Sequence, residues 1–370
     1  MVFHGVANPL CLVFADFFPK LFEMRDDIIK IIHKFVLHNV VLHKFVYCVY
    51  VLLSRVVILL VVSIKMTTFT EKIKITQIIE NQMKRIYVFA IIVLTLQNAG
   101  SANAQPSTAA DGEWKLVWND EFDGDGAVSD AYWNYERGFV RNHEYQWYQP
   151  QNAYKREGIL FLEGRLDSIP NPQYKCDSQN WKQNRPYARY SSASINTHGK
   201  FSFKYGRMEV RARIPAVMGS WPAIWTLGNE MEWPSNGEID IMEFYHVQGR
   251  PHILANAAWG SDRRFNAVWN SKRIPYSHFL EQDPYWNEKF HVWRMDWDEG
   301  HIAIHLDGEL LNDIDTSATI NGAPGGNANP FRQPHYILLN LAIGGDNGGE
   351  PQAGAFPMRY EIDYVRVYQK

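Results

Sequence analysis

The sequence predicts an all-β domain, a sandwich of two antiparallel sheets, over residues 113–370 of the 370-residue chain. Short segments in which apolar and polar residues alternate recur along this part, and Gly, Pro, Asn and Asp separate them. No long stretch with a 3.6-residue period interrupts them. Many short strands joined by frequent turns are typical of two packed antiparallel sheets.

Three segments show the predicted strands in chain order. Residues 159–163 (ILFLE) form a short apolar run, and residues 207–214 (RMEVRARI) alternate charged and apolar side chains. The second pattern is expected of a strand with one face in water. Residues 301–306 (HIAIHL) are followed by Asp307-Gly308, which predicts a tight hairpin turn.

A further predicted strand, residues 237–245 (GEIDIMEFY), carries three carboxylates: Glu238, Asp240 and Glu243. In a regular strand Glu238 and Asp240 share one face and Glu243 points to the other. One extra residue between them, a β-bulge, would bring all three to the same side. The alternative is a solvated strand face with ordinary surface acids, although strands rarely carry three acids among Ile, Met and Phe.

The bulge has a consequence for chemistry. Glu238 and Glu243 would be spaced like an i to i+4 pair, with about 13 Å between their Cα atoms. Two long Glu side chains that lean together could bring their carboxyl groups to about 5–5.5 Å, the separation that retaining glycosidases use. Trp221, Trp225 and Trp233 lie nearby in the sequence, and indole faces suit a sugar-binding cleft because pyranose C–H faces stack on them.

Taken together, these features resemble glycoside hydrolase family 16, in the branch with the bulged E-x-D-x-x-E motif that includes laminarinases and agarases. The resemblance covers about residues 113–370 and implies a concanavalin A-like β-jelly roll with a substrate cleft on the concave face. Other matching stretches follow in the family's order: 118–122 (WNDEF), 142–148 (NHEYQWY), 198–207 (HGKFSFKYGR), 290–294 (FHVWR), 339–345 (LNLAIGG) and 362–368 (IDYVRVY).

The resemblance implies that Glu238 is the nucleophile, that Glu243 is the general acid/base, and that Asp240 orients Glu238. The acid must hold its proton near neutral pH, and we expect the charges of Glu238 and Asp240 to raise its pKa. A swapped order of acid and nucleophile would have the same composition, so the order rests on the resemblance alone.

Six residues are candidates for substrate binding. The alternatives are core packing for Trp221, Trp225 and Trp233, a turn-forming role for the asparagine, and a surface ion pair with Glu209 or Glu361 for the arginine. The candidates are Asn142, Arg207, Trp221, Trp225, Trp233 and Trp259.

A structural calcium on the convex side is common in this family, and Glu121 and Asp363 stand at the matching positions. Hard oxygen ligands suit calcium, but two acids are a weak signal. No His/Cys cluster has the spacing of a zinc site. We expect no cofactor for catalysis.

The first 104 residues differ from the rest, because all 13 Trp and 23 of the 25 Gly lie after them. Residues 83–104 combine a basic start, an apolar run and an Ala-Asn-Ala end, which predicts a signal peptide. Residues 1–82 are then an over-extended start, and residues 105–112 a linker. The alternative is a membrane anchor at residues 45–64, although Arg55 at its centre would cost about 2.5–3.5 kcal/mol.

Removal of residues 1–104, with 11 basic and 6 acidic residues, leaves 37 − 11 = 26 basic and 40 − 6 = 34 acidic residues, a net charge of −8. This charge argues against nucleic acids and heavily sulfated glycans as partners. Cys176 is the one cysteine left, so no intramolecular disulfide can form. We expect a monomer without a stable membrane anchor that is secreted or held in the periplasm or at the cell surface.

The predicted function is a retaining endo-β-glycanase for β-1,3- or mixed β-1,3/1,4-glucan. Laminarinases usually place a His-aromatic-Gly sequence in the next strand, and here residues 254–260 read LANAAWG, with Ala258 or Asn256 in place of the His. An endo-β-galactanase with the same acids therefore remains open, as does a transglycosylase. A non-catalytic carbohydrate-binding module is a third alternative, which the three intact acids oppose.

Overall fold

A computed structural model of the protein describes residues 113–370. The predicted signal peptide (83–104) and linker (105–112), the over-extended start (1–82) and the alternative anchor (45–64) lie outside the described residues. Within residues 113–370, no helix is both long and apolar enough to cross a membrane.

The larger sheet has ten strands, eight of them in one path with β1 beside β17 and β4 beside β5. Neighbours pair antiparallel except β3 and β6, which are parallel. In spatial order the path is β15 (Glu309–Asp315), β14 (His301–Leu306), β13 (His291–Trp297), β8 (Gly206–Arg213), β17 (Met358–Gln369), β5 (Ile159–Pro170), β6 (Tyr187–Ser192) and β3 (Gln146–Tyr148); the branches are β1 (Lys115–Asp120) and β4 (Ala153–Arg156).

The smaller sheet has seven strands and is antiparallel throughout. It carries the segment with the three acids as a central strand. Its spatial order is β12 (Ala267–Pro275), β11 (Arg250–Gly260), β10 (Glu238–Val247), β9 (Ser220–Gly228), β16 (His335–Ile343), β7 (Ser194–Asn196) and β2 (Asn134–Tyr135).

The predicted sandwich of two antiparallel sheets is confirmed. The three sequence segments form β5, β8 and β14, and Asp307-Gly308 turns β14 into β15 with positive φ at both residues, 49° and 90°. Helices are short: α4 (Tyr276–Gln282), α5 (Gly345–Gly348), η1 (Pro150–Asn152), η2 (Trp286–Glu288), η3 (Thr316–Ala318), η4 (Ala323–Gly325), η5 (Pro330–Arg332) and η6 (Ala353–Ala355).

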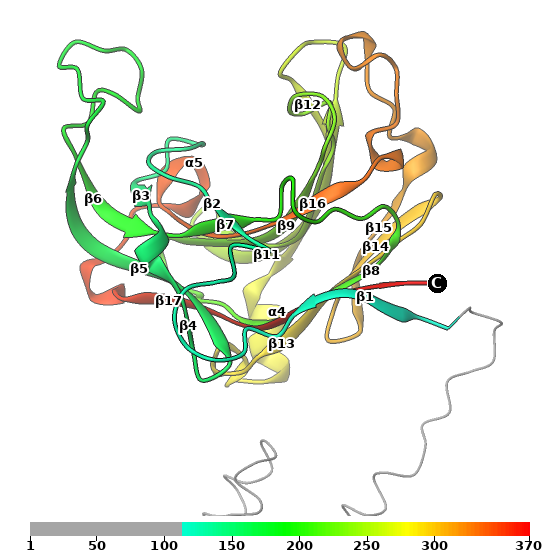
Figure 1. Cartoon of the computed structure of the whole chain (residues 1–370), viewed down its shortest axis with the longest axis horizontal. Helices are drawn as coiled ribbons and strands as arrows, with labels where there is room; N and C mark the ends of the chain where they lie inside the picture. Colours follow the sequence, from blue (N-terminus) through cyan, green and yellow to red (C-terminus); the bar gives the residue numbers. More distant parts are fainter. Residues whose placement is uncertain (1–112) are drawn as a thin grey trace, which may run out of the picture. The chain divides into compact units, whose positions relative to one another are not determined.

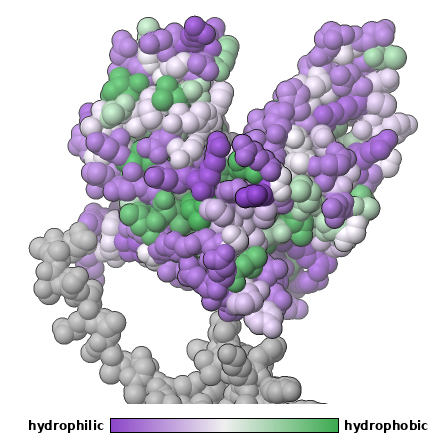
Figure 2. Space-filling view, turned by 180° about the vertical axis from the view of Figure 1, so that it is seen from behind, coloured by the Kyte–Doolittle hydropathy of each residue, from purple (hydrophilic) through white to green (hydrophobic). Residues whose placement is uncertain are grey.

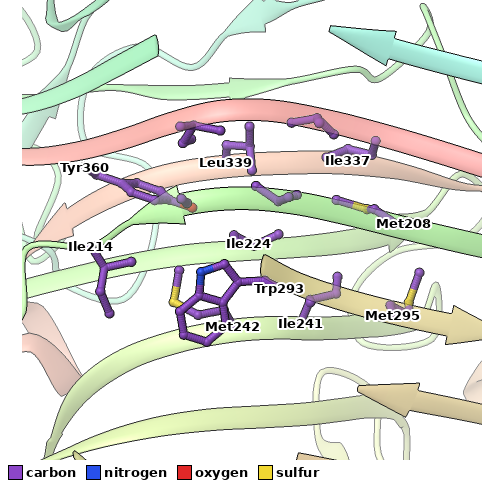
Figure 3. Packing of buried hydrophobic residues seen from close by; sticks show 14 of the residues in the cluster. Met208, Ile214, Ile224, Ile241, Met242, Trp293, Met295, Ile337, Leu339 and Tyr360 are labelled. Atoms are coloured by element: carbon purple, nitrogen blue, oxygen red, sulfur yellow. The ribbon is translucent and has the colours of Figure 1, made fainter. Parts of the chain in front are cut away.

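The core fills the space between the two sheets. Alternate residues of β8 and β13 point inward, and their side chains meet those of β9, β10 and β16 from the opposite sheet. Figure 3 shows side chains of both sheets in this layer, Met208 and Trp293 from the larger sheet and Ile224, Ile241 and Met242 from the smaller. Because the core fixes one face of each strand, it also fixes which side chains reach the opposite face.

A groove opens over the outer face of the seven-stranded sheet. The β5–β6 connection rises on one side of it, and the β11–β12 hairpin and the segment before β16 rise on the other (Figure 1). Seen from behind, the space between these two walls is open (Figure 2). We call this groove the cleft, and the side of the seven-stranded sheet that lines it the cleft face.

Candidate active site

A β-bulge in β10 places the three acids on the cleft face. Asp240 pairs with Asn256 and Glu243 pairs with Leu254, so two residues of β10 stand opposite one residue of β11. The two residues between Asp240 and Glu243, Ile241 and Met242, are both fully buried in the core. Glu238, Asp240 and Glu243 therefore point away from the core together, and the predicted bulge is confirmed.

Each acid is held by neutral N–H donors. The Trp233 indole Nε1 donates to Glu238 Oε2 at 2.6 Å, and the Trp221 Nε1 donates to Glu243 Oε1 at 2.8 Å. The Asn256 amide Nδ2 donates to Glu243 Oε2 at 2.9 Å and to Asp240 Oδ2 at 3.3 Å.

Asp240 and Glu238 also hydrogen-bond to each other, so the carboxyl groups form a continuous chain from Glu238 through Asp240 and Asn256 to Glu243. None of the three acids forms an ion pair with a cation of residues 113–370.

These surroundings raise the pKa of the carboxyl groups. Burial raises the pKa of Glu243 to about 7; the Trp221 and Asn256 hydrogen bonds lower it, and the charge of Glu238 adds to the rise. Burial also raises the pKa of Asp240 well above its ordinary value, and the charges of Glu238 and Glu243 raise it further. Burial, more than the neighbouring charge expected from the sequence, is therefore the main cause of the raised pKa of Glu243.

Glu238 is in a different position from Glu243. Burial raises its pKa too, but hydrogen bonds from Trp233 and Asp240 and the charge of Arg141 all lower it. Two glutamates whose surroundings push their protonation apart can act as nucleophile and acid.

Two tryptophans of β9 line the floor of the cleft. Trp221 and Trp225 share the cleft face with Ala223, which pairs directly with Glu243. Trp225 packs with Ala223 and Leu338 in a small cluster apart from the main core, and its Nε1 donates to Asn340 Oδ1 at 2.7 Å. Trp225 is thus buried, but it packs on the cleft side of the seven-stranded sheet and not in the core between the two sheets.

Arg141 is a residue of the cleft that sequence reasoning missed. Its guanidinium lies 5.1 Å from the centre of the Trp225 ring, and it pairs with Glu136, which also accepts a 2.6 Å hydrogen bond from Ser194 Oγ. The charge of Arg141 lowers the pKa of Glu238. The sequence offered one signal for Arg141, its position directly before the segment 142–148. Its contact with Trp225 could not be predicted from this, because Trp225 lies in β9, more than 80 residues further along the chain.

Asn142 lies in a turn near the cleft and shows no contact with the acids. It has a left-handed φ of 53°, and its carbonyl accepts a hydrogen bond from the Asp346 N–H at 3.0 Å. These features agree with the turn-forming alternative; a contact with sugar remains a proposal.

The structure corrects the prediction for Arg207. This residue lies in β8 of the ten-stranded sheet, where Met208 beside it faces the core and Arg207 faces the opposite surface. Its Nε and Nη2 donate to Asp296 Oδ1 and Oδ2 at 2.6 and 2.9 Å. Arg207 cannot reach a substrate at the acids, because the sandwich separates the two surfaces; its pairing with Asp296 is a surface ion pair, with a carboxylate other than the two expected.

Trp259 is the second correction. Ala258 pairs with Glu238 and takes the cleft-face position, so the next residue, Trp259, points to the other side and packs against the core. Strand alternation alone decides this once the pairing with β10 is known.

Glu121 and Asp363, the proposed calcium ligands, are engaged by arginines. Arg366 Nε and Nη2 donate to Glu121 Oε1 and Oε2 at 2.9 and 2.8 Å, and Arg211 pairs with Asp363. In residues 113–370 no three His, Cys, Asp or Glu side chains gather as a metal site would require. Carboxylates neutralised by guanidinium groups do not fit a calcium ion, so the donor set argues against this site.

Comparisons with known proteins place the site in a family. The model of "Glycosyl hydrolases family 16" matches residues 167–366. A second model, "Beta-glucan synthesis-associated protein SKN1/KRE6/Sbg1", matches residues 23–234, of which 113–234 are described by the structure.

Curated relatives cover most of the described chain. This chain is 35% identical to a glucan endo-1,3-beta-glucosidase A1 of Niallia circulans over 72% of its length. It is 32% identical to a beta-glucanase of Rhodothermus marinus over 69% of its length. A keratan-sulfate endo-1,4-beta-galactosidase of Sphingobacterium multivorum is 30% identical over 71% of this chain. The chain spans 39%, 85% and 57% of the lengths of these three relatives.

Solved structures agree. A structure described under endo-acting O-glycanases of the human gut microbiota that initiate mucin breakdown is 34% identical, with a TM-score of 0.61, 72% of this chain covered and 94% of the other. The laminarinase catalytic domain of Thermotoga maritima is 32% identical, with a TM-score of 0.57 and coverages of 70% and 99%. The β-jelly roll is therefore that of a glycosyl hydrolase family 16 domain, and the chain belongs to this family.

Proposed function

We propose that residues 113–370 form a retaining endo-β-glycanase that hydrolyses β-1,3- or mixed β-1,3/1,4-glucan. The observation that carries this proposal is the bulge of β10, which puts Glu238 and Glu243 on one face but in different hydrogen-bonding surroundings. Glu243, with a pKa of about 7, supplies a proton near neutral pH, while Arg141 and Trp233 favour the ionised form of Glu238.

In the first step Glu243 donates its proton to the glycosidic oxygen as the Glu238 carboxylate attacks the anomeric carbon. The C–O bond to the leaving sugar breaks, and a covalent glycosyl-enzyme forms. In the second step the Glu243 carboxylate removes a proton from water, which attacks the same carbon and releases Glu238. Asp240, protonated and bonded to Glu238, holds the nucleophile in place.

The glucan assignment is supported by the relatives whose names describe glucan-cleaving enzymes. A specific observation favours a second candidate, an endo-β-galactanase. Asn256 and Ala258 both face the cleft beside the acids, so the departure from the laminarinase pattern lies in the site itself. One relative is named as a galactosidase and one solved structure as an O-glycanase. A non-catalytic binding role is opposed by the three intact acids.

The proposal includes the setting of the enzyme. We propose that it acts as a secreted monomer on extracellular polysaccharide, by way of the signal peptide at residues 83–104. N-terminal sequencing of exported protein should then begin near Gln105, and recovery of residues 1–82 on mature protein would contradict this.

Separate replacement of the two glutamates tests the mechanism. Glu238→Ala should lose turnover almost completely while it still binds oligosaccharide, because no glycosyl-enzyme can form. Glu243→Ala should lose polysaccharide hydrolysis by about 10²- to 10⁴-fold but retain glycosylation by substrates with good leaving groups. Azide should restore Glu243→Ala and give a β-glycosyl azide, and with Glu238→Ala it should give the α-azide.

The opposite azide products would reverse the roles of the two glutamates, and inverted products from the unaltered enzyme would rule out the retaining mechanism. Product chromatography after incubation with laminarin, lichenan, agarose and porphyran separates glucan from galactan as substrate.

A further inference from the structure

The edge strand β12 presents a row of side chains to the cleft. Trp269 pairs with Ala258, Ser271 with Asn256 and Arg273 with Leu254, and these three partners stand beside Glu238, Asp240 and Glu243. Directly paired residues of antiparallel strands point to the same face, so Trp269, Ser271 and Arg273 share the cleft face with the acids. We call these three residues the β12 row.

The residues between them confirm this orientation. Asn270 Oδ1 accepts a hydrogen bond of 3.2 Å from Asn312 Nδ2 of β15, in the opposite sheet. Asn270 therefore faces the sandwich interior, and its neighbours Trp269 and Ser271 face the cleft. Lys272 pairs with the buried Ala255 and lies on the side away from the cleft.

The β12 row is open to a ligand. Trp269 is 47% exposed, and both Ser271 and Arg273 are exposed. Ala258, which separates Trp269 from Glu238, is small, so the cleft floor between them is low. Neighbouring strands lie about 4.8 Å apart, which puts the Trp269 backbone about 10 Å from that of Glu238. A sugar chain that crosses the strands over the acids would therefore continue over β12.

Arg273 is paired with no carboxylate among residues 113–370, whereas Arg141 on the other side of the acids is paired with Glu136. Its guanidinium acts on the cleft: burial and the charge of Glu243 raise the pKa of Tyr245, and the charge of Arg273 opposes this rise. An exposed indole and, four residues further along the same face of β12, an unpaired guanidinium offer a stacking surface and a planar set of donors that matches an oxyanion.

We propose that Trp269 and Arg273 form an outer subsite of the cleft for an acidic sugar, one whose substituent is a sulfate ester or a carboxylate. The sugar ring stacks on Trp269, and its acidic group accepts hydrogen bonds from Arg273. One unpaired cation suits one charged group, which agrees with a net-acidic domain that repels heavily charged polymers. The inference rests on the proposed endo-β-glycanase activity and sharpens the choice of substrate, because a neutral β-glucan carries no such acidic group.

Binding to matched probes tests the subsite without turnover. The Glu238→Gln protein is titrated calorimetrically, at low ionic strength, with keratan sulfate and its chemically desulfated form. Laminarin and laminarin oxidised to carboxylates at its primary hydroxyls form the second pair. The acidic member of at least one pair should bind about two- to fivefold more tightly, the range of an exposed ion pair.

Added substitutions assign this preference. Arg273→Gln should abolish it and leave binding of the neutral members unchanged, while Trp269→Ala should weaken both members of a pair. Lys272→Gln is the matched control, because it removes a charge from the same strand on the other face; the preference should survive it, and high salt should reduce it.

Unchanged preference in Arg273→Gln, or equal loss in Lys272→Gln, would overturn the subsite. Turnover by the unaltered enzyme separates this failure from that of the proposed function. If the enzyme cleaves one of the four glycans and Arg273→Gln behaves like its parent, the subsite alone is wrong. If the folded enzyme cleaves none of these four, nor lichenan, agarose or porphyran, the proposed function fails and the subsite with it.

Discussion

Carboxylates on the two outer surfaces of this sandwich are held in opposite ways. On the cleft face, Glu238, Asp240 and Glu243 accept hydrogen bonds from indole and amide N–H groups, and burial raises the pKa of each. On the ten-stranded sheet, Glu121 is bound by Arg366, whose hydrogen bond lowers its pKa.

The same side chain therefore becomes a proton donor or a fixed anion according to its partner. A neutral donor orients a carboxyl group but stabilises its charge less than a guanidinium does, so the buried group keeps its proton. The outer face of the ten-stranded sheet, which we call the convex face, shows this pairing repeatedly. Asp363 is held there by Arg211, Glu361 by Arg213 and Asp296 by Arg207. A proton-donating catalytic group needs neutral donors around its carboxyl group, whereas a carboxylate paired with an arginine contributes to stability.

The largest effect is expected when a cation is placed among the cleft acids. Asn256→Lys puts an ammonium group between Asp240 and Glu243, which would lower the pKa of Glu243 and keep it ionised at neutral pH. Polysaccharide hydrolysis should fall by about 10²-fold or more. Aryl glycosides with good leaving groups should lose much less, because their departure needs little proton donation.

The comparison of kcat/KM on the two substrate types checks this. Asn256→Ala is the matched variant without the cation and should spare polysaccharide hydrolysis more than Asn256→Lys does. Equal loss on both substrate types in Asn256→Lys would show steric damage instead of a change in protonation.

A smaller effect is expected from Trp221→Phe, which removes a hydrogen-bond donor from Glu243. That donor lowers the pKa of Glu243, so its loss should raise the pKa above about 7. Because the proposed mechanism needs protonated Glu243, activity should fall as pH rises through this pKa, and the alkaline limb of the kcat profile should move to higher pH. We also expect the kcat of Trp221→Phe at pH 6 to fall about tenfold, the effect of losing one charge-assisted hydrogen bond.

Trp225→Phe is the control for this shift. Trp225 lies on the same face of β9, but its indole donates to Asn340 instead of an acid. Its removal should leave the alkaline limb in place. A shift of the same size in both variants would mean that Trp221 acts through packing.

On the convex face, Arg366→Met should lower the free energy of unfolding by about 0.5–1 kcal/mol at pH 7, since the pair with Glu121 is half-exposed. The lowered pKa of Glu121 means that this stabilisation is present above its ordinary value of 4.5 and is lost as pH falls below it. Urea unfolding of the unaltered protein and of Arg366→Met, at pH 7 and at a pH below 4.5, measures the difference between their free energies of unfolding. This difference should be smaller at the lower pH. Unchanged kcat at pH 7 is expected, and a large loss of activity would contradict the separation of the two surfaces.

The smallest effect is expected from chelation. Since Glu121 and Asp363 are bound by arginines, removal of calcium with a chelator should change neither the Tm nor the activity. A fall in Tm with chelator that added calcium reverses would show that these carboxylates, or backbone carbonyls near them, bind the ion after all.

The bulge of β10 could be predicted from the sequence because it depends on local alternation. Three acids among Ile239, Ile241, Met242 and Phe244 can share a face only if one residue is extra, and the register with β9 and β11 shows this. The hairpin at Asp307-Gly308 is local in the same sense, since both residues adopt the positive φ that their types allow. Fold class and the place of the acids were thus determined by the sequence.

Partners from distant strands were decided only by the tertiary structure. Whether Trp259 faces the cleft depends on how β11 pairs with β10, and Arg207 lies on the far surface because β8 belongs to the other sheet. The Arg141 contact with Trp225 and the bridge from Asn256 to Glu243 join residues that no sequence spacing relates. Alternation along a strand is set by its own backbone, but the neighbour across a sheet is set by the packing of the whole domain.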